Sequence, residues 1–330
     1  MNHMNFRKDA KKIAGFAVIL ILVLVMIFSG LRILESTVFY NTGNMEDTTA
    51  SKTIERNGVK YFPRQDITVI MVLGIDKYGV VEPSGSYNND GDADMVALLI
   101  FDETNKTVSA VCLNRDTMLE MPVLGIGGRQ AGTIYQQLTL AHTYGSGLED
   151  SCENMKTTVS DFLNGLHIDY YFSMNMDAIS ILNDAVGGVT VNVTDDFSNL
   201  DPSITMGEVT LQGQQAINFV RTRKGLGDQL NISRMERQRA YINGFMDALQ
   251  EKLEKSDSFA LNTYSRISPY IVTDISSNAF NGILQRYSDY ELKEIVSPEG
   301  ENVHGSEYME FYVDEEALDD LILRSFYAPK

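Results

Sequence analysis

Residues 67–75, "ITVIMVLGI", form a continuous apolar run rich in β-branched side chains. Such a run is typical of a strand that is buried on both faces of a sheet. Two further apolar runs follow it, "MVALLIF" at residues 95–101 and "TVSAVCL" at residues 107–113. The turn "DETNK" between them predicts that the chain reverses there and that the two strands pair. The three runs therefore predict the centre of one sheet.

Polar residues stand at matching ends of the three predicted strands. Asp76 follows the first strand, Asp94 precedes the second, and Arg115 follows the third. If the strands are antiparallel neighbours, these three positions meet at one end of the sheet. We therefore treat that end of the sheet as a candidate site.

The rest of the chain continues the alternation of strands and helices. "CENMKTTVSDFLNGL", residues 152–166, predicts a helix, and residues 168–193 predict a strand, a helix, a turn and a strand. Residues 233–254 predict a long amphipathic helix. Because no internal repeat and no second linker interrupts this order, residues 65–330 predict one α/β domain.

A basic segment and a long apolar segment open the sequence. Residues 1–12 carry four basic side chains, and residues 13–31, "IAGFAVILILVLVMIFSGL", carry no charge. A helix of this length reaches about 28 Å, close to the hydrocarbon thickness of a bilayer. A cleaved signal peptide is the alternative, but its apolar region is usually shorter, and no small-x-small cleavage site follows. The sequence predicts a retained transmembrane helix with residues 1–12 in the cytoplasm, a polar, irregular extracellular stalk over residues 32–64, and the domain outside the cell.

The charge balance excludes a broad class of partners. The 330-residue chain has a formal net charge of −18, and residues 33–330 hold 22 basic and 44 acidic side chains. An exported body with this balance should not bind nucleic acid or anionic lipid over a broad surface. A local basic cluster inside such a body is therefore informative.

That cluster occupies residues 219–239, "FVRTRKGLGDQLNISRMERQR". If the "RTR" segment is extended, Arg221 and Arg223 point to the same side. Guanidinium groups are planar, bidentate donors that suit phosphate oxygens. Surface ion pairs with the chain's many carboxylates are the alternative use of these arginines.

The second half of the cluster lies on the predicted amphipathic helix. At about 100° per residue, Arg234 and Gln238 are one turn apart and face the same side. Arg237 and Arg239 point elsewhere and are expected to meet solvent or acidic surface. The helix therefore predicts that Arg234 and Gln238, but not Arg237, join an anion site with the "RTR" arginines.

Asp76 and Asp94 are candidate ligands for a divalent cation. Mg²⁺ prefers carboxylate oxygens, with water and phosphate completing its shell. The "DGDAD" segment that contains Asp94 fails the pattern of an EF-hand calcium loop, because Met95 stands at the glycine position and Phe101 at the closing glutamate position. Solvated or capping aspartates are the alternative interpretation.

The other residues with reactive side chains indicate no hydrolase centre. The four histidines show no metal or triad spacing, and no serine stands in a nucleophile elbow. Cys112 and Cys152 form one possible disulfide in an exported domain, and two buried free thiols are the alternative.

Six motifs, in order, resemble the LytR-CpsA-Psr family of membrane-anchored bacterial cell-envelope proteins. They are "VLGID", "DADMV", "LNRDT", "DAVGGVTVNV", "FVRTR" and "RMERQ". The resemblance covers nearly the whole exported domain and implies an α/β/α sandwich with a central mixed β-sheet and an apolar tunnel for a polyprenyl tail. It implies a phosphotransferase that uses Mg²⁺ to move a glycopolymer from a polyprenyl-pyrophosphate carrier to N-acetylmuramic acid of peptidoglycan.

The resemblance also implies roles for individual residues. Asp76 and Asp94 match the family's magnesium site, and Asp76 is either a ligand of that metal or the base that takes the proton of the glycan hydroxyl. Asp116 is expected to have a structural role, orienting either the loop or its neighbour Arg115. Candidate catalytic residues are Asp76, Arg115 and Arg221. The residues that match the family's pyrophosphate-binding set are Arg115, Arg221, Arg223, Arg234 and Gln238.

Two positions depart from the family pattern. Asn114 replaces a proline that many members have before the Arg-Asp pair, and Gln137 replaces a lysine, so one phosphate contact of the family is not assured. Two other functions would use nearly the same residues: a non-catalytic lipid-pyrophosphate-binding envelope regulator, and a pyrophosphatase that hydrolyses the carrier-linked glycan. Candidates for selecting the glycopolymer are the "SGSYNNDGD" loop and residues 120–135.

Overall fold

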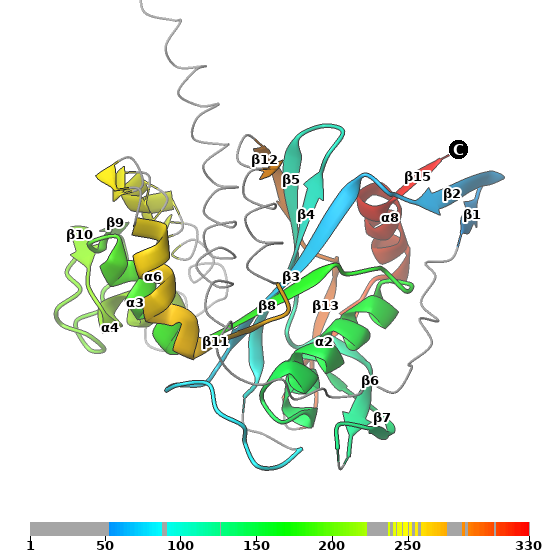
Figure 1. The fold of residues 1–330 in the computed structure, drawn as a ribbon, viewed down its shortest axis with the longest axis horizontal. Helices are drawn as coiled ribbons and strands as arrows, with labels where there is room; N and C mark the ends of the chain where they lie inside the picture. The colour runs from blue at the N-terminus through cyan, green and yellow to red at the C-terminus, as the bar shows by residue number, and fades with distance from the viewer. Residues whose placement is uncertain are drawn as a thin grey trace, which may run out of the picture.

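A six-stranded mixed sheet runs through the centre of the protein (Figure 1). The computed structural model describes residues 53–87, 91–125, 127–222, 259–275, 290–306 and 308–329, with individual positions in 237–256 and 286–287. The strand order of the sheet is β11-β8-β3-β4-β5-β12. The strands are β3 (Ile67–Ile75), β4 (Ala93–Asp102), β5 (Thr107–Leu113), β8 (Tyr170–Asn175), β11 (Ile271–Thr273) and β12 (Glu291–Val296).

The three predicted central strands are neighbours. β3, β4 and β5 pair antiparallel in that order, as the sequence predicts. β8 is parallel to β3, β12 is parallel to β5, and β11 is antiparallel to β8. The predicted strands at residues 67–75 and 107–113 have the observed bounds.

Alternation of side chains along β3 separates two hydrophobic cores. Val69, Met71 and Leu73 pack on one face with buried side chains of α2 (Glu149–Phe162) and α8 (Glu315–Phe326). Ile70 packs on the other face with α3 (Met176–Ala185), α4 (Gln214–Arg221) and α6 (Phe259–Ile267). Helices thus cover both faces of a central mixed sheet, which agrees with the expected fold (Figure 1). Burial on both faces explains why the strand is apolar throughout.

Short elements surround the central sheet. η1 (Leu138–Tyr144) and η2 (Ser268–Tyr270) are 3₁₀ helices. Three two-stranded sheets lie around the central sheet: β6 (Met118–Leu124) with β7 (Gln130–Gln137), β9 (Val189–Val193) with β10 (Gly207–Leu211), and β13 (Gly300–His304) with β14 (Met309–Val313).

A three-stranded sheet contradicts part of the predicted stalk. β1 (Ile54–Arg56) and β2 (Val59–Pro63) form a hairpin, and β15 (Tyr327–Pro329) pairs with β2. The prediction that residues 54–63 are irregular was therefore wrong. The turn consists of Asn57 and Gly58, both with positive φ, and Asn-Gly is a strong hairpin signal.

The predicted anchor lies outside the described residues. The same is true of the predicted cytoplasmic residues 1–12 and of residues 32–52 of the predicted stalk. Within the described part of the chain, no helix is long and apolar enough to cross a membrane. The helix at residues 13–31 stays a prediction.

Cys112 and Cys152 are free thiols, which corrects the possible disulfide. Cys152 of α2 is buried in the same core as Val111 and Leu113 of β5. Because side chains alternate along a strand, Cys112 points to the opposite face of the sheet. A disulfide requires Cβ atoms about 4 Å apart, and here the sheet separates the two side chains.

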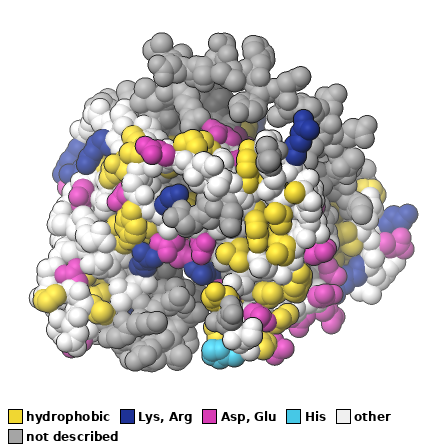
Figure 2. All heavy atoms as spheres, turned by 90° about the horizontal axis from the view of Figure 1, so that it is seen from below, with side chains coloured by type: hydrophobic (Ala, Val, Ile, Leu, Met, Phe, Trp, Pro, Cys, Tyr) yellow, Lys and Arg dark blue, Asp and Glu magenta, His cyan; other side chains and the backbone are white. Residues whose placement is uncertain are grey.

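The surface combines charged and apolar areas. On the face that Figure 2 shows, lysine, arginine, aspartate and glutamate side chains gather near the centre, with hydrophobic side chains beside them. The exposed large hydrophobic side chains of the described residues include Tyr78, Tyr135, Tyr308 and Tyr312.

Candidate active site

A β-bulge places Asp94 beside the end of β3. Gly74 lies opposite Met95 and Ile75 lies opposite Ala93, so Asp94 is the additional residue between two pairs. A bulge bends a strand and redirects the side chain of the extra residue. The backbone N–H of Asp76 then donates to the carbonyl of Asp92 at 2.8 Å, which continues the pairing past the strand end. The two predicted carboxylates are therefore on adjacent strand ends.

Arg115 reaches Asp94 from the end of β5. Its guanidinium forms an ion pair with the Asp94 carboxylate, and its Nε lies 3.3 Å from Asp116 Oδ1. The Arg115 and Asp94 side chains are 29% and 25% exposed, so both remain open to a ligand. The structure therefore brings Asp94 and Arg115 together, as the strand order predicts, and places Asp116 in contact with Arg115.

Gln137 and Asn114 hold the loop that carries Arg115. Gln137 Nε2 donates to Asp116 Oδ1 at 3.2 Å and to the Met309 carbonyl at 2.7 Å. The Asn114 side chain accepts from the backbone N–H of Asp116 at 3.0 Å. The Gln137 amide therefore links the loop that carries Arg115 to the Met309 backbone. Asn114 supplies a side-chain acceptor that a proline lacks.

Arg221 approaches the same end of the sheet from α4. Its guanidinium forms an ion pair with Asp76, and its Nη1 lies 3.0 Å from the hydroxyl of Tyr78. The Arg221 side chain is 40% exposed. The predicted extended conformation is wrong for this residue, because Arg221 is the last residue of a helix and the extended backbone begins at Thr222.

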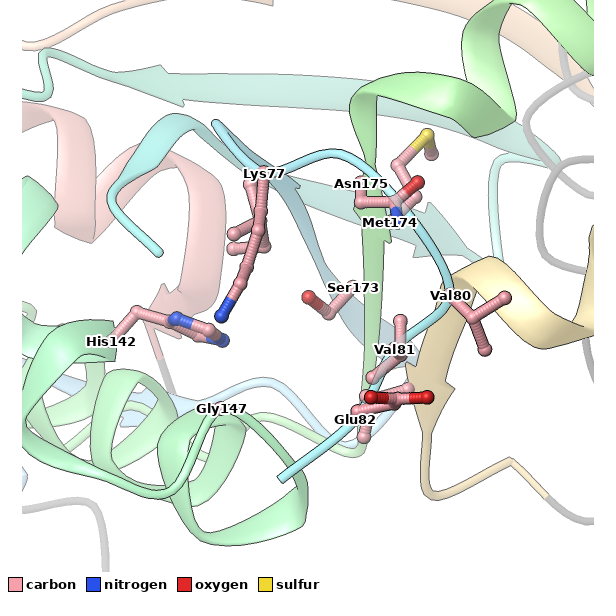
Figure 3. A pocket seen from close by; sticks show the side chains of 11 residues that line it. Lys77, Val80, Val81, Glu82, His142, Gly147, Ser173, Met174 and Asn175 are labelled. Atoms are coloured by element: carbon pink, nitrogen blue, oxygen red, sulfur yellow. The ribbon is translucent and has the colours of Figure 1, made fainter. Parts of the chain in front are cut away.

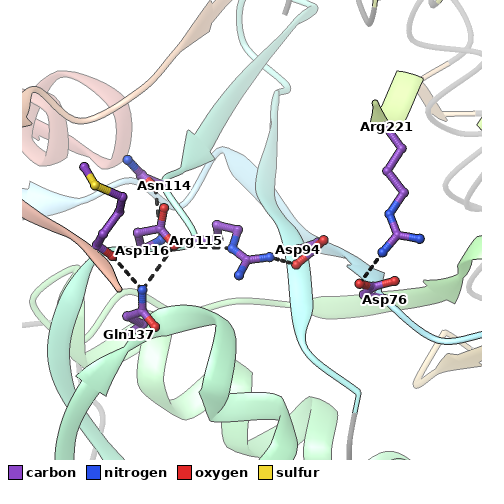
Figure 4. A network of polar contacts seen from close by, with 8 residues as sticks. Asp76, Asp94, Asn114, Arg115, Asp116, Gln137 and Arg221 are labelled. Carbon is purple, nitrogen blue, oxygen red and sulfur yellow. Dashed lines mark hydrogen bonds and ion pairs between the residues drawn. The ribbon is translucent and has the colours of Figure 1, made fainter. Parts of the chain in front are cut away.

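Figure 4 shows the ion pairs of Arg115 and Arg221 together with the residues that support Arg115. From β7 toward α4 it labels Gln137, Asp116, Arg115, Asp94, Asp76 and Arg221. Sequence reasoning missed Tyr78, although its position two residues after Asp76 was an available signal.

Arg237 is buried, which contradicts its predicted exposure. Only 4% of the residue is exposed, and its guanidinium pairs with Asp195. It donates from Nε to the Phe219 carbonyl at 3.0 Å and from Nη2 to the Thr222 carbonyl. These carbonyls belong to the C-terminal turn of α4, where backbone acceptors lack helical partners. Arg237 therefore anchors the helix end that carries Arg221.

Three predicted phosphate-binding residues lie outside the described residues. They are Arg223, Arg234 and Gln238. Arg223 follows Thr222 in sequence, and Arg234 and Gln238 lie on either side of Arg237. The contact of Arg237 with the Thr222 carbonyl therefore connects the two halves of the basic cluster. Their contact with phosphate stays a prediction.

The donor set at Asp76 and Asp94 fits Mg²⁺. In the described part of the chain, no group of three or more His, Cys, Asp or Glu side chains could enclose a metal. Mg²⁺ does not need such a cage, because it commonly takes one or two carboxylates together with water and substrate phosphate. Each carboxylate faces an arginine, and phosphate oxygens would satisfy those arginines if the carboxylates held a metal.

A small cavity lies next to the Asp76 loop (Figure 3). Its volume is about 30 Å³, and Lys77, His142, Ser173 and Asn175 are among its lining residues. His142 is 2% exposed, and its Nδ1 lies 2.7 Å from the Gly91 carbonyl. Burial lowers the pKa of His142 to about 4. The cavity is too small for a polyprenyl chain, so the expected apolar tunnel stays a prediction.

Comparisons with known proteins identify the family. A sequence profile of the LytR_cpsA_psr family matches residues 34–322. The chain is 25% identical over 332 residues to the polyisoprenyl-teichoic acid–peptidoglycan teichoic acid transferase TagU of Bacillus subtilis (strain 168), covering 96% of each protein. The solved structure of gbs0355 from Streptococcus agalactiae has a TM-score of 0.62 at 22% identity, covering 78% of this chain and 86% of that one. TagT bound to LIIa-WTA has a TM-score of 0.55 at 20% identity, covering 79% and 89%. Since the profile spans most of its length, the chain belongs to the LytR-CpsA-Psr family.

Proposed function

We propose that this chain transfers a phosphoglycan from a polyprenyl-pyrophosphate carrier to peptidoglycan, where it forms a phosphodiester with N-acetylmuramic acid. Its family membership and the transferase name of its relatives support transfer of a cell-wall glycopolymer to peptidoglycan. The lipid pyrophosphate, the metal and the anchor at residues 13–31 belong to the proposal. The protein then works at the outer surface of a bacterial membrane.

One observation carries the proposal: two arginine–aspartate pairs meet at one end of the sheet. Arg115 pairs with Asp94, and Arg221 pairs with Asp76. A pyrophosphate at this position exchanges these carboxylate partners for phosphate oxygens without loss of guanidinium hydrogen bonds. Phosphoryl transfer is accelerated mainly by such positioning and charge neutralisation.

The reaction exchanges the phosphoanhydride bond of the pyrophosphate for a phosphate ester bond. The acceptor hydroxyl oxygen attacks the phosphorus that carries the glycan, and the bond from this phosphorus to the polyprenyl phosphate breaks. Arg115 and Arg221 neutralise charge on the transferred and leaving phosphates. The hydroxyl proton passes to a carboxylate, for which Asp76 is the candidate when it is not itself a ligand of the metal. Asp76 and Asp94 would hold Mg²⁺, which supplies further positive charge to the phosphate oxygens when bound.

Reconstitution with the full chain tests this proposal. We would combine the protein, Mg²⁺, a polyprenyl-pyrophosphate oligosaccharide and peptidoglycan oligomers, and follow both glycan transfer and polyprenyl phosphate release. We expect transfer that a chelator stops and Mg²⁺ restores. Asp94→Asn should lower kcat/KM by at least about a hundredfold, whereas the exposed control Arg286→Ala should retain wild-type activity, because its side chain is 62% exposed.

The same assay separates the two alternative functions. Tight binding of the lipid pyrophosphate without turnover would establish a regulator instead of an enzyme. Polyprenyl phosphate release at the same rate with and without peptidoglycan would establish a pyrophosphatase.

A further inference from the structure

Two neighbouring hairpins, β6–β7 and β13–β14, form a surface beside the candidate active site. Thr117 and Phe311 form a parallel bridge between them, and the backbone N–H of Phe311 donates to the Asp116 carbonyl at 2.8 Å. The Phe311 side chain is only 6% exposed. The hairpins are therefore fixed to each other at the residue that contacts Arg115.

Exposed apolar side chains concentrate on these hairpins. Twelve large hydrophobic residues are exposed in the described part of the chain, and five of them are on these hairpins or in the β13–β14 turn. Tyr308 is 66% exposed and Tyr135 is 53% exposed. Exposed apolar area of this kind marks binding surfaces. Met309 lies on the side of β14 that carries Phe311, and we call the other four residues the tyrosine face: Tyr135, Val303, Tyr308 and Tyr312.

The tyrosine face is continuous with the arginine pairs. Tyr135 and Gln137 are two residues apart on β7, so their side chains leave the same side of the strand. Gln137 contacts both Asp116 and the Met309 carbonyl. The pKa of Tyr312 is raised mainly by its hydrogen bond to Glu310, and the nearby Tyr135 adds to this shift. In Figure 4, Gln137 lies on the side of Arg115 that faces away from Arg221.

Charge on the tyrosine face selects between the two substrates. Glu120 pairs across the hairpin with Tyr135, Glu301 pairs with Tyr312, and Glu310 accepts from the Tyr312 hydroxyl at 2.7 Å. These carboxylates disfavour a polyanionic phosphoglycan. They can accept hydrogen bonds from sugar hydroxyls, while tyrosine rings stack on the C–H faces of pyranose rings. Transfer also requires the acceptor to approach the phosphorus roughly opposite the leaving group.

We propose that the tyrosine face binds the glycan strand of the peptidoglycan acceptor and presents its hydroxyl to the transferred phosphate. The donor pyrophosphate then lies toward Asp76 and Arg221, and the acceptor arrives across β7 and β14. This assignment rests on the transferase function proposed above.

Kinetics with each substrate varied separately tests the assignment. Removing the two rings in Tyr135→Ala/Tyr312→Ala should raise the KM for peptidoglycan oligomers about tenfold and leave the KM for the donor within about twofold of wild type. Tyr135→Phe keeps the ring and should behave as wild type. The matched control is Leu200→Ala, which truncates a 46% exposed side chain away from these hairpins.

A binding measurement keeps the test independent of turnover. The chain contains no tryptophan, so tyrosine emission of the full chain in detergent can follow titration with a peptidoglycan tetrasaccharide without donor. We expect saturable binding that the double variant weakens about tenfold and that soluble phosphoglycan does not compete away.

Three results would overturn the assignment. In a chain that transfers, an unchanged acceptor KM in the double variant would remove the tyrosine face from the acceptor site and leave the transferase function intact. If the wild type does not transfer glycan, the transferase proposal fails, and the binding measurement alone then tests the tyrosine face. Equal tetrasaccharide binding by the wild type and the double variant would show that the tyrosine face does not bind the acceptor. A wild-type dimer that becomes monomeric in the double variant by sedimentation would show that a second copy covers this face.

Discussion

At the scale of single residues, the site consists of charged side chains that are held in position by ion pairs but remain partly exposed. Arg115 and Arg221 each face a carboxylate with side chains that remain 25–40% exposed. Exposed pairs of this kind contribute little to stability, about 0–1 kcal/mol each. The pairs therefore keep the guanidinium groups in position for a ligand rather than hold the fold together.

His142 makes the free energy of unfolding sensitive to mild acid. Burial lowers its pKa to about 4 from an ordinary value of 6.5. As pH falls below 6.5, His142 binds a proton in the unfolded chain but not in the folded chain, so the free energy of unfolding decreases between pH 6.5 and about 4. We expect the free energy of unfolding to fall by about 1.4 kcal/mol for each pH unit from this group alone.

Urea unfolding of wild type, His142→Gln and His167→Gln at pH 7.5, 6.0 and 5.0 measures this effect. His142→Gln should show a shallower loss of stability with falling pH. The control His167→Gln should follow wild type, because that side chain is 72% exposed. Equal slopes for wild type and His142→Gln would contradict the assigned cause.

The sequence could predict those site residues that lie at the ends of the three central strands. Asp76, Asp94 and Arg115 come together because three antiparallel strands bring their ends together. It could not predict that Gln137 and Met309 support Arg115, because that contact joins segments 172 residues apart.

At the scale of elements, one buried arginine links α4 to the chain after β9. Arg237 binds two carbonyls at the end of α4 and pairs with Asp195, while its guanidinium lies 5.8 Å from the Phe197 ring. Helical periodicity predicted the wrong environment for Arg237, because these partners come from other elements and leave no trace in the helix pattern. The end of α4, and with it Arg221, depends on this contact.

Arg237→Ala should therefore destabilise the protein by about 3–5 kcal/mol, because it leaves the Asp195 carboxylate, which is only 15% exposed, and two backbone carbonyls without their partner. Transfer should also fall, because the end of α4 loses its anchor. Urea unfolding and kcat/KM measure the two effects, and Arg221→Ala is the contrast: it should lower kcat/KM with little change in unfolding. An unfolding midpoint for Arg237→Ala equal to that of the exposed control Arg286→Ala would show that the anchor is not needed.

Strands buried on both faces were predictable, and the small sheets were less so. β3 and β5 consist mostly of apolar residues, so their bounds are visible in the sequence. β1 and β2 are short and half-exposed, and the Asn57-Gly58 turn is their only clear signal in the sequence. β15 pairs with β2 across most of the sequence, which no local pattern can indicate.

At the scale of the whole molecule, we expect one membrane-anchored orientation. Basic residues before an apolar segment favour a cytoplasmic N-terminus, so an epitope at residue 1 should be protected from protease added to intact cells. An epitope after residue 330 should be removed. Both epitopes should be lost when the cells are permeabilised, and loss of the first epitope from intact cells would contradict the predicted topology.

The sheet formed by β1, β2 and β15 sets the time at which folding can finish. A contact between Arg56 and Asp320 beside this sheet spans 264 residues. At about 5–20 residues per second, the ribosome needs on the order of tens of seconds to synthesise that interval. Throughout this time one side of β2 lacks its partner strand. A nascent chain that stops before β15 therefore keeps an open strand edge, which chaperones and proteases can recognise, whereas a chain that includes β15 closes that edge by pairing β15 with β2.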